Sequence, residues 1–119
     1  MTMSKIIKVP TLQTQRLTLR MWQKKDDTAL FAYARDPDVG PNAGWKPHAS
    51  KMESRMIIDQ LFRRNMTWAI EEKETGTIVG SIGLEDDKYR PEIKSKEMGY
   101  SLAKSRWGRG YMTEAARRV

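Results

Sequence analysis

The sequence predicts a single α/β domain, residues 1–119, in which helices pack on a mixed sheet in the order β-α-α-β-β-β-α. Three observations predict this class. Several segments alternate apolar and polar residues like strands, two N-terminal segments have helical spacing, and a strand, a glycine-containing loop and a helix follow one another near the C-terminus. Of the 119 residues, 39% are hydrophobic and 31% are charged, which suits one domain with an ordinary core.

The first strand and the first helix are predicted from residues 16–34. Residues 16–22 alternate in polarity, as in a strand with one buried face. Residues 24–34 predict a helix that has two aspartates in its first turn and that Pro37 stops. The loop over residues 36–49 contains three prolines and two glycines. The inward face of this helix is expected to consist of Ala29, Leu30 and Tyr33.

A capping box predicts where the second helix begins. Ser50 and Glu53 have the spacing of an N-cap residue and its reciprocal partner, and the helix is expected to end near Arg64. Its apolar residues recur at helical spacing and are expected to face the core. This inward stripe consists of Met52, Met56, Ile57, Gln60 and Leu61. Together with Met21 and Met66, the methionines of this stripe are interpreted as core filling.

The remaining elements are three strands and a helix. Residues 66–71 and 77–84 predict a hairpin around the turn 73–76. Gly80 and Gly83 inside the second of these strands indicate a bulge or the close approach of another backbone. Residues 96–102 predict the fourth strand, and a helix begins near residue 109.

The most informative segment runs from Glu97 to Ala116. It reads as a short strand, a basic Gly-x-Gly loop and the first turns of an Ala-rich helix. The first N–H groups of a helix have no partner within the helix, and the helix dipole is positive there. Gly108 and Gly110 allow an anion to approach the backbone, and Arg106 and Arg109 add positive charge. The segment therefore predicts a phosphate or pyrophosphate site, the alternative being a basic surface turn.

The same segment resembles the acetyl-CoA signature of the GNAT superfamily of N-acetyltransferases. The resemblance is carried by Gly99-Tyr100 and by Trp107-Gly108-Arg109-Gly110-Tyr111-Met112-Thr113-Glu114-Ala115, and it is strongest to the Rim-type branch, which includes acetyltransferases of ribosomal-protein N-termini. Upstream, residues 14–20 resemble the opening strand of the family and residues 75–84 resemble its central hairpin. One position departs from the superfamily loop, because Ser105 stands where the family has Gln or Arg.

The resemblance implies the acyl-CoA N-acyltransferase fold and transfer of an acetyl group from acetyl-CoA to a primary amine. Backbone groups near Leu102 would pair with the pantetheine arm, and the N–H groups of the loop would hold the pyrophosphate. No metal is implied. The residues expected to bind acetyl-CoA are Tyr100, Leu102, Arg106, Gly108, Arg109, Gly110, Tyr111, Met112 and Thr113.

Three further residues are considered for the acceptor side. The amine must be neutral to attack, so the site needs a proton acceptor, and Glu97 stands where many Rim-type relatives carry a strand glutamate. The alternative for Glu97 is a solvated carboxylate beside Lys96. Trp45 is expected to line the acceptor pocket, and His48 is expected to be solvated in its loop. The acceptor can be a protein N-terminus or a small amine.

Charge and composition limit the other classes of function. The net charge is +7, and residues 88–119 hold nine basic and three acidic residues, so the positive field surrounds the predicted loop. Such a field attracts coenzyme A, and it leaves a small nucleic-acid-binding domain as the alternative, although aromatic residues do not interleave with the basic ones. There is no cysteine and one histidine, which excludes disulfides and the usual zinc sites. No signal peptide or membrane span is predicted, so a cytoplasmic location is expected.

The end of the chain gives a last expectation. Residue 119 falls inside the predicted final helix, whereas GNAT relatives continue through further strands and a helix, one of which carries the acid for the leaving thiolate. We therefore expect a C-terminally incomplete GNAT domain, either a fragment with coenzyme binding but no catalysis or a domain whose missing part comes from another chain. An uncovered strand edge favours a homo-oligomer.

Overall fold

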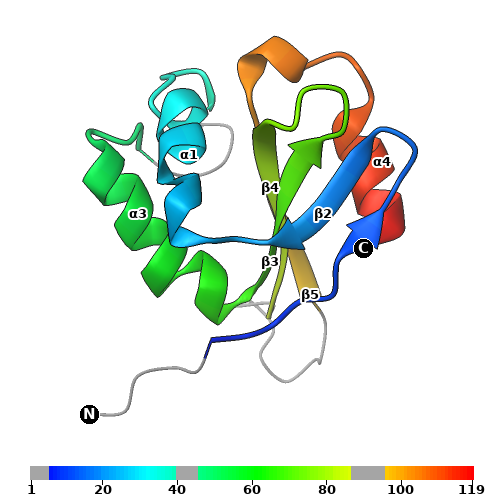
Figure 1. Ribbon diagram of the computed structural model, residues 1–119, viewed down its shortest axis with the longest axis horizontal. Helices are drawn as coiled ribbons and strands as arrows, with labels where there is room; N and C mark the ends of the chain where they lie inside the picture. The colour runs from blue at the N-terminus through cyan, green and yellow to red at the C-terminus, as the bar shows by residue number, and fades with distance from the viewer. Residues whose placement is uncertain (1–5, 40–45, 87–95) are drawn as a thin grey trace.

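The computed structural model describes residues 6–39, 46–86 and 96–119, with the backbone alone at 85–86 and 96–99. Its elements follow the predicted order, with one short additional strand, β1, at the start (Figure 1). Single turns of 3-10 helix precede α1, follow α3 and follow β5. The main elements are β1 (Leu12–Gln13), β2 (Leu17–Met21), α1 (Asp27–Ala34), α3 (Lys51–Gln60), β3 (Met66–Glu72), β4 (Ile78–Asp86), β5 (Lys96–Leu102) and α4 (Tyr111–Arg118).

The five strands form one sheet in sequence order, and every pairing among the described residues is antiparallel. Helices α1 and α3 lie on one face of this sheet, and α4 lies on the other (Figure 1). Within the part of the chain described, β5 is an edge strand. The structure thus confirms the predicted α/β class.

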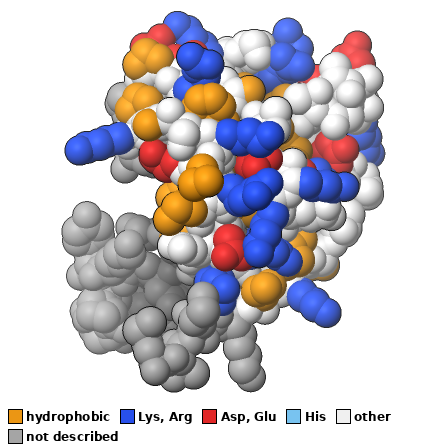
Figure 2. Space-filling model, turned by 60° about the vertical axis from the view of Figure 1, so that its left-hand side comes forward, with side chains coloured by type: hydrophobic (Ala, Val, Ile, Leu, Met, Phe, Trp, Pro, Cys, Tyr) orange, Lys and Arg blue, Asp and Glu red, His pale blue; other side chains and the backbone are white. Residues whose placement is uncertain are grey.

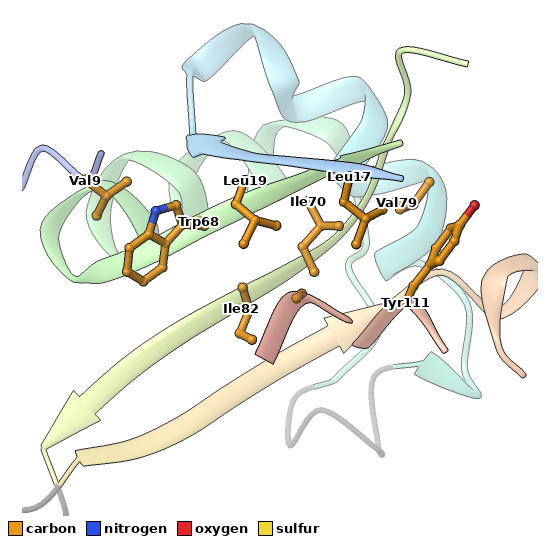
Figure 3. Close-up of a cluster of buried hydrophobic side chains, with 9 residues drawn as sticks. Val9, Leu17, Leu19, Trp68, Ile70, Val79, Ile82 and Tyr111 are labelled. Atoms are coloured by element: carbon orange, nitrogen blue, oxygen red, sulfur yellow. The ribbon is translucent and has the colours of Figure 1, made fainter. Parts of the chain in front are cut away.

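Strand alternation divides the core into two clusters. On the α4 face, Leu19, Trp68, Ile70 and Ile82 belong to one buried cluster that extends to Tyr111 (Figure 3). The cluster under α1 and α3 contains Trp22, Leu30, Tyr33, Ala34, Val39, Ile58, Phe62, Ala69 and Ile78. Side chains two residues apart on a strand point to the same face, so β3 presents residues 68, 70 and 72 toward α4. Glu72 therefore lies on the α4 side of the sheet, where Tyr111 contacts it.

A bulge in β4 confirms the prediction made from its glycines. Ile70 pairs with Gly80 and Glu71 pairs with Ile78, so Val79 is the additional residue. A Cβ atom on Gly80 would lie 2.4 Å from the carbonyl oxygen of Ser101, which no side chain tolerates. The bulge and the close approach bring the end of β5 against β4, where the Ala103 N–H donates to the Val79 carbonyl.

The predicted inward stripe of α3 is wrong. Met52 and Met56 are 73% and 51% exposed, and Leu61, which follows the helix, is also exposed. Ser54 and Ile58 face the core instead, and Ile57 is partly buried against it. The small Ser54 on this face lies against the His48 ring. Figure 2, which brings the α1 and α3 side forward, shows hydrophobic side chains between Lys and Arg side chains on the surface.

Met21 and Met66 are partly buried against the α4-side cluster, so the core interpretation holds for them. The N-cap half of the predicted capping box is confirmed, since the Ser50 hydroxyl accepts from the Glu53 N–H at 3.1 Å. The glutamate reaches back to the N–H of Ala49, one residue before the N-cap.

Candidate functional site

The residues predicted to bind the coenzyme converge on one cavity at the end of β5. Its volume is about 370 Å³, within the usual range for small-molecule sites. All of the predicted coenzyme residues except Arg109 line it. The complete lining is Val39, Tyr100, Ser101, Leu102, Arg106, Trp107, Gly108, Gly110, Tyr111, Met112 and Thr113.

The backbone of residues 107–110, which we call the glycine loop, has the form that an anion site needs. Gly108 and Gly110 have φ angles of +78° and +77°, a left-handed conformation that side-chain-bearing residues rarely adopt. Gly110 is also the N-cap of α4, and the first α-helical bond runs from the Glu114 N–H to the Gly110 carbonyl. The N–H groups of residues 111–113 therefore have no acceptor within the helix, and the positive end of its dipole lies at the cavity.

A buried carboxylate at the end of β3 connects to both sides of the glycine loop. The Glu72 side chain is 2% exposed. Its oxygens accept two hydrogen bonds from the Arg106 guanidinium, at 3.0 and 2.9 Å, and one from the Tyr111 hydroxyl at 2.7 Å. The Thr75 hydroxyl donates a fourth at 2.8 Å. We call these four residues (Glu72, Thr75, Arg106 and Tyr111) the Glu72 hub.

The hub fixes the charge of its members. Hydrogen bonding from Arg106, reinforced by Tyr111 and Thr75, outweighs burial and lowers the pKa of Glu72 to about 2. The same pairing raises the pKa of the Arg106 guanidinium and of the Tyr111 hydroxyl. Arg106 is thus a cavity-lining residue whose cation is already matched by a buried anion. The Arg109 side chain is about half exposed, with its guanidinium 4.0 Å from Glu72.

A second set of contacts, made by Arg16, also holds the loop. Arg16 donates from its Nη1 to the carbonyl oxygen of Arg109 at 2.8 Å, and its Nε donates to Glu114 at 2.7 Å. The Arg16 guanidinium also lies 4.5 Å from the centre of the Tyr111 ring. In a trans peptide the C=O and the following N–H point in opposite directions, so the Arg16 contact turns the Gly110 N–H away from Arg16.

Trp107 joins the loop to the strand that precedes it. Its indole N–H donates to the Leu102 carbonyl at 2.9 Å, while the side chain is 40% exposed and lines the cavity. The residue predicted to offer backbone groups to a pantetheine arm therefore already uses its carbonyl for one hydrogen bond.

Behind the cavity, three buried hydroxyl groups form a chain between α1 and the sheet. Ser101 lies 2.8 Å from the Ser81 hydroxyl and 3.1 Å from the Tyr33 hydroxyl. Burial raises the pKa of Tyr33 to about 12, so this phenol stays protonated. These three hydroxyl groups are neutral hydrogen-bonding groups, and none of them is a base.

The structure describes only part of the residues that were considered for the acceptor side. Glu97 lies in β5 with its backbone opposite Glu85, and its side chain lies outside what the structure describes. Trp45 also lies outside the described residues. The prediction of a solvated His48 is wrong, since this residue is 5% exposed and its Nδ1 lies 2.7 Å from the Ser54 hydroxyl. Burial lowers the pKa of His48, which favours the neutral ring.

Glu72 and Arg16 are the residues that the sequence prediction missed. A signal existed for Glu72, because it shares the face of Trp68 and Ile70 on an alternating strand, and a charged residue on a buried face needs partners. Arg16 directly precedes β2, and no local pattern connects it with Glu114, which is far away along the chain.

The geometry agrees with comparison to known proteins. The family model for the acetyltransferase (GNAT) domain matches residues 16–119. The chain belongs to the GNAT acetyltransferase family. Two curated relatives of this GNAT domain are the uncharacterized N-acetyltransferase p20 of Bacillus licheniformis, 29% identical over 92% of the chain, and the uncharacterized protein YkkB of Bacillus subtilis, 32% identical over 89%. The chain spans 63% of the length of each.

Solved structures show the same fold. A GNAT-family acetyltransferase from Bacillus anthracis superposes with a TM-score of 0.75 at 19% identity, covering 92% of this chain and 63% of that one. An acetyltransferase from Agrobacterium tumefaciens superposes with a TM-score of 0.68 at 26% identity, covering 98% of this chain and 67% of that one. The ribosomal-protein-S5-alanine acetyltransferase of Vibrio fischeri gives 0.64 at 18%, with coverages of 91% and 63%.

Among the described residues, no helix combines the length and apolar character that crossing a bilayer requires. The same part of the chain contains no group of three or more His, Asp or Glu side chains placed to hold a metal ion.

Proposed function

We propose that this GNAT domain binds acetyl-CoA at the cavity beside the glycine loop and transfers the acetyl group to a primary amine. One observation carries the proposal: two left-handed glycines and the unpaired N–H groups that begin α4 line one cavity next to the end of β5. The chain spans less than two thirds of the length of its curated relatives, so the acetyl transfer is stated as a proposal.

The residues fit this cosubstrate. The N–H groups of residues 111–113 and the α4 dipole suit the pyrophosphate, and the exposed Arg109 supplies an accessible cation. The cavity walls formed by Val39, Leu102 and Met112 suit the less polar pantetheine arm. When bound, acetyl-CoA supplies the acetyl group as an activated thioester.

The chain's own chemical task is to orient the amine and to remove its proton. As the nitrogen bonds to the acetyl carbon and the carbon–sulfur bond breaks, the amine loses a proton and the thiolate gains one. We propose Glu97 as the proton acceptor, directly or through a water, and Trp45 as part of the acceptor pocket. Ribosomal-protein acetyltransferases among the structural relatives support a Rim-type acceptor, a protein N-terminus, with a small amine as the alternative.

Calorimetry with coenzyme A and with a single-stranded oligonucleotide tests the binding proposal. We expect saturable, one-to-one binding of coenzyme A that persists at moderate salt. Oligonucleotide binding should be weak and should fall steeply as salt is added, because it rests on the basic surface alone. Tight oligonucleotide binding without coenzyme A binding would favour the nucleic-acid alternative.

The catalytic proposal is tested with Glu97→Gln in the full-length protein. Loss of a general base slows turnover by about 10²–10⁴-fold, and affinity for coenzyme A should be unchanged. Glu74→Gln, which makes the same charge change in the exposed β3–β4 turn, is the control. Equal turnover in the two variants would remove Glu97 from the mechanism.

A further inference from the structure

We infer that Glu72 is a positioning residue for the coenzyme: it anchors both ends of the glycine loop and thereby holds the loop's N–H donors in place. The inference rests on the proposed function of the cavity. Glu72 itself lies outside the cavity lining and acts through Arg106 and Tyr111, which are part of it.

The two anchors of the glycine loop lie on either side of it along the chain. Arg106 precedes the glycine loop and Tyr111 follows it as the first residue of α4. Both side chains bind the same carboxylate, Arg106 with two hydrogen bonds and Tyr111 with one. The four residues between them include two left-handed glycines, which alone would leave the loop adaptable. One buried group therefore closes the loop at its base.

The Glu72 carboxylate is itself held in place. Glu72 ends β3, where its N–H donates to the Thr77 carbonyl and its carbonyl accepts from the Gly76 N–H. Thr75, in the same turn, donates to the side-chain oxygen that also accepts from Arg106 Nη2. The loop is thus attached to the sheet by a group that is rigid in both backbone and side chain.

The negative charge of Glu72 lies beside the proposed anion site. A carboxylate next to an anion site opposes anion binding by charge alone, so a residue kept only for local charge would weaken coenzyme binding. Glu72 also occupies the Arg106 cation, which a phosphate could otherwise use. If Glu72 positions the loop, this role outweighs both effects, and removing its charge weakens coenzyme A binding. If Glu72 acts through local charge alone, removing the charge strengthens coenzyme A binding.

Calorimetry with coenzyme A on the whole chain separates these views. We expect Glu72→Gln, which keeps the shape and removes the charge, to weaken coenzyme A binding by about tenfold, as expected for the loss of one well-placed charged hydrogen bond. Tyr111→Phe removes only the hydroxyl and should weaken binding by a smaller factor. Glu71→Gln is the matched control, because Glu71 precedes Glu72 and pairs with Arg20 away from the loop.

A second readout separates positioning from general destabilisation. In Glu72→Gln, binding of ADP, which carries the pyrophosphate, should weaken, whereas binding of pantetheine, which carries no phosphate, should not change. Hydrogen exchange should accelerate at residues 107–113 and stay unchanged in β2 and β3.

The outcomes are distinguishable. Unchanged or tighter coenzyme A binding in Glu72→Gln would overturn the inference and leave the proposed function standing. A wild-type chain that does not bind coenzyme A would overturn both. If Glu72→Gln does not fold, Tyr111→Phe decides: weaker binding supports the positioning role, and unchanged binding refutes it.

Discussion

Two segments on opposite sides of the sheet are held by different chemistry. The glycine loop, on the α4 side, is anchored through charge, with a buried carboxylate accepting four hydrogen bonds. The segment before α3 is anchored at a buried histidine: the His48 ring meets the Ser54 hydroxyl at 2.7 Å, and the His48 N–H donates to the Ala34 carbonyl at 3.0 Å. The hub lies beside the proposed anion site, and its buried carboxylate pairs with Arg106 there.

The largest expected effect is on the charged anchor. Glu72→Ala should lower the free energy of unfolding by about 3 kcal/mol, because it leaves the mostly buried Arg106 cation without its partner. Glu71→Ala should cost at most about 1 kcal/mol, since the Arg20–Glu71 pair is partly exposed to solvent. Urea denaturation of both variants measures the difference. Equal losses would show that the hub is no stronger than a surface ion pair.

The His48–Ser54 anchor should contribute less to the free energy of unfolding than the Glu72 hub. His48→Ala removes a buried hydrogen-bonding partner of Ser54, at a cost of about 2 kcal/mol. Met52→Ala on α3 should change stability by less than about 0.5 kcal/mol because Met52 is largely exposed. A large loss from Met52→Ala would instead support the inward stripe that the sequence predicted.

The smallest effect, and the one that best separates the two anchors, is their response to acid. The pKa of His48 is lowered by burial, against an opposing contribution from Glu53, so its stabilisation is complete above its usual pKa of 6.5 and is lost as pH falls below that value. The pKa of Glu72 is lowered from 4.5 to about 2, so its contribution is complete above pH 4.5 and is lost only toward pH 2.

Urea denaturation between pH 7.5 and 5.5 checks this prediction. The wild type should lose more stability over this range than His48→Gln, and the difference is the histidine contribution. Parallel pH profiles for the two proteins would mean that burial does not perturb the ring.

The sequence predicted much of this structure because its signals are local. Alternating polarity located the strands, the Ser50–Glu53 spacing located the start of α3, and Gly80 indicated the bulge. The glycine loop was predicted from order alone, strand then glycines then helix. What failed depends on tertiary contacts. Met52 and Met56 have the right spacing to be buried, but Ser54 and Ile58 occupy the contact face. Glu72 and Arg16 reach the loop from distant segments, which no local window contains.

The most direct test of the central claim, that the glycine loop binds the coenzyme's pyrophosphate, is calorimetry with coenzyme A on Gly108→Asp and Gly108→Asn. A Cβ atom on Gly108 meets nothing within 4 Å, whereas one on Gly110 would contact Arg16 at 3.6 Å, so position 108 isolates the loop. Asn and Asp tolerate the left-handed conformation similarly and differ in charge. We predict that Gly108→Asp binds coenzyme A at least about tenfold more weakly than Gly108→Asn, because a carboxylate at the loop repels phosphate. Equal affinities in the two variants would contradict the account.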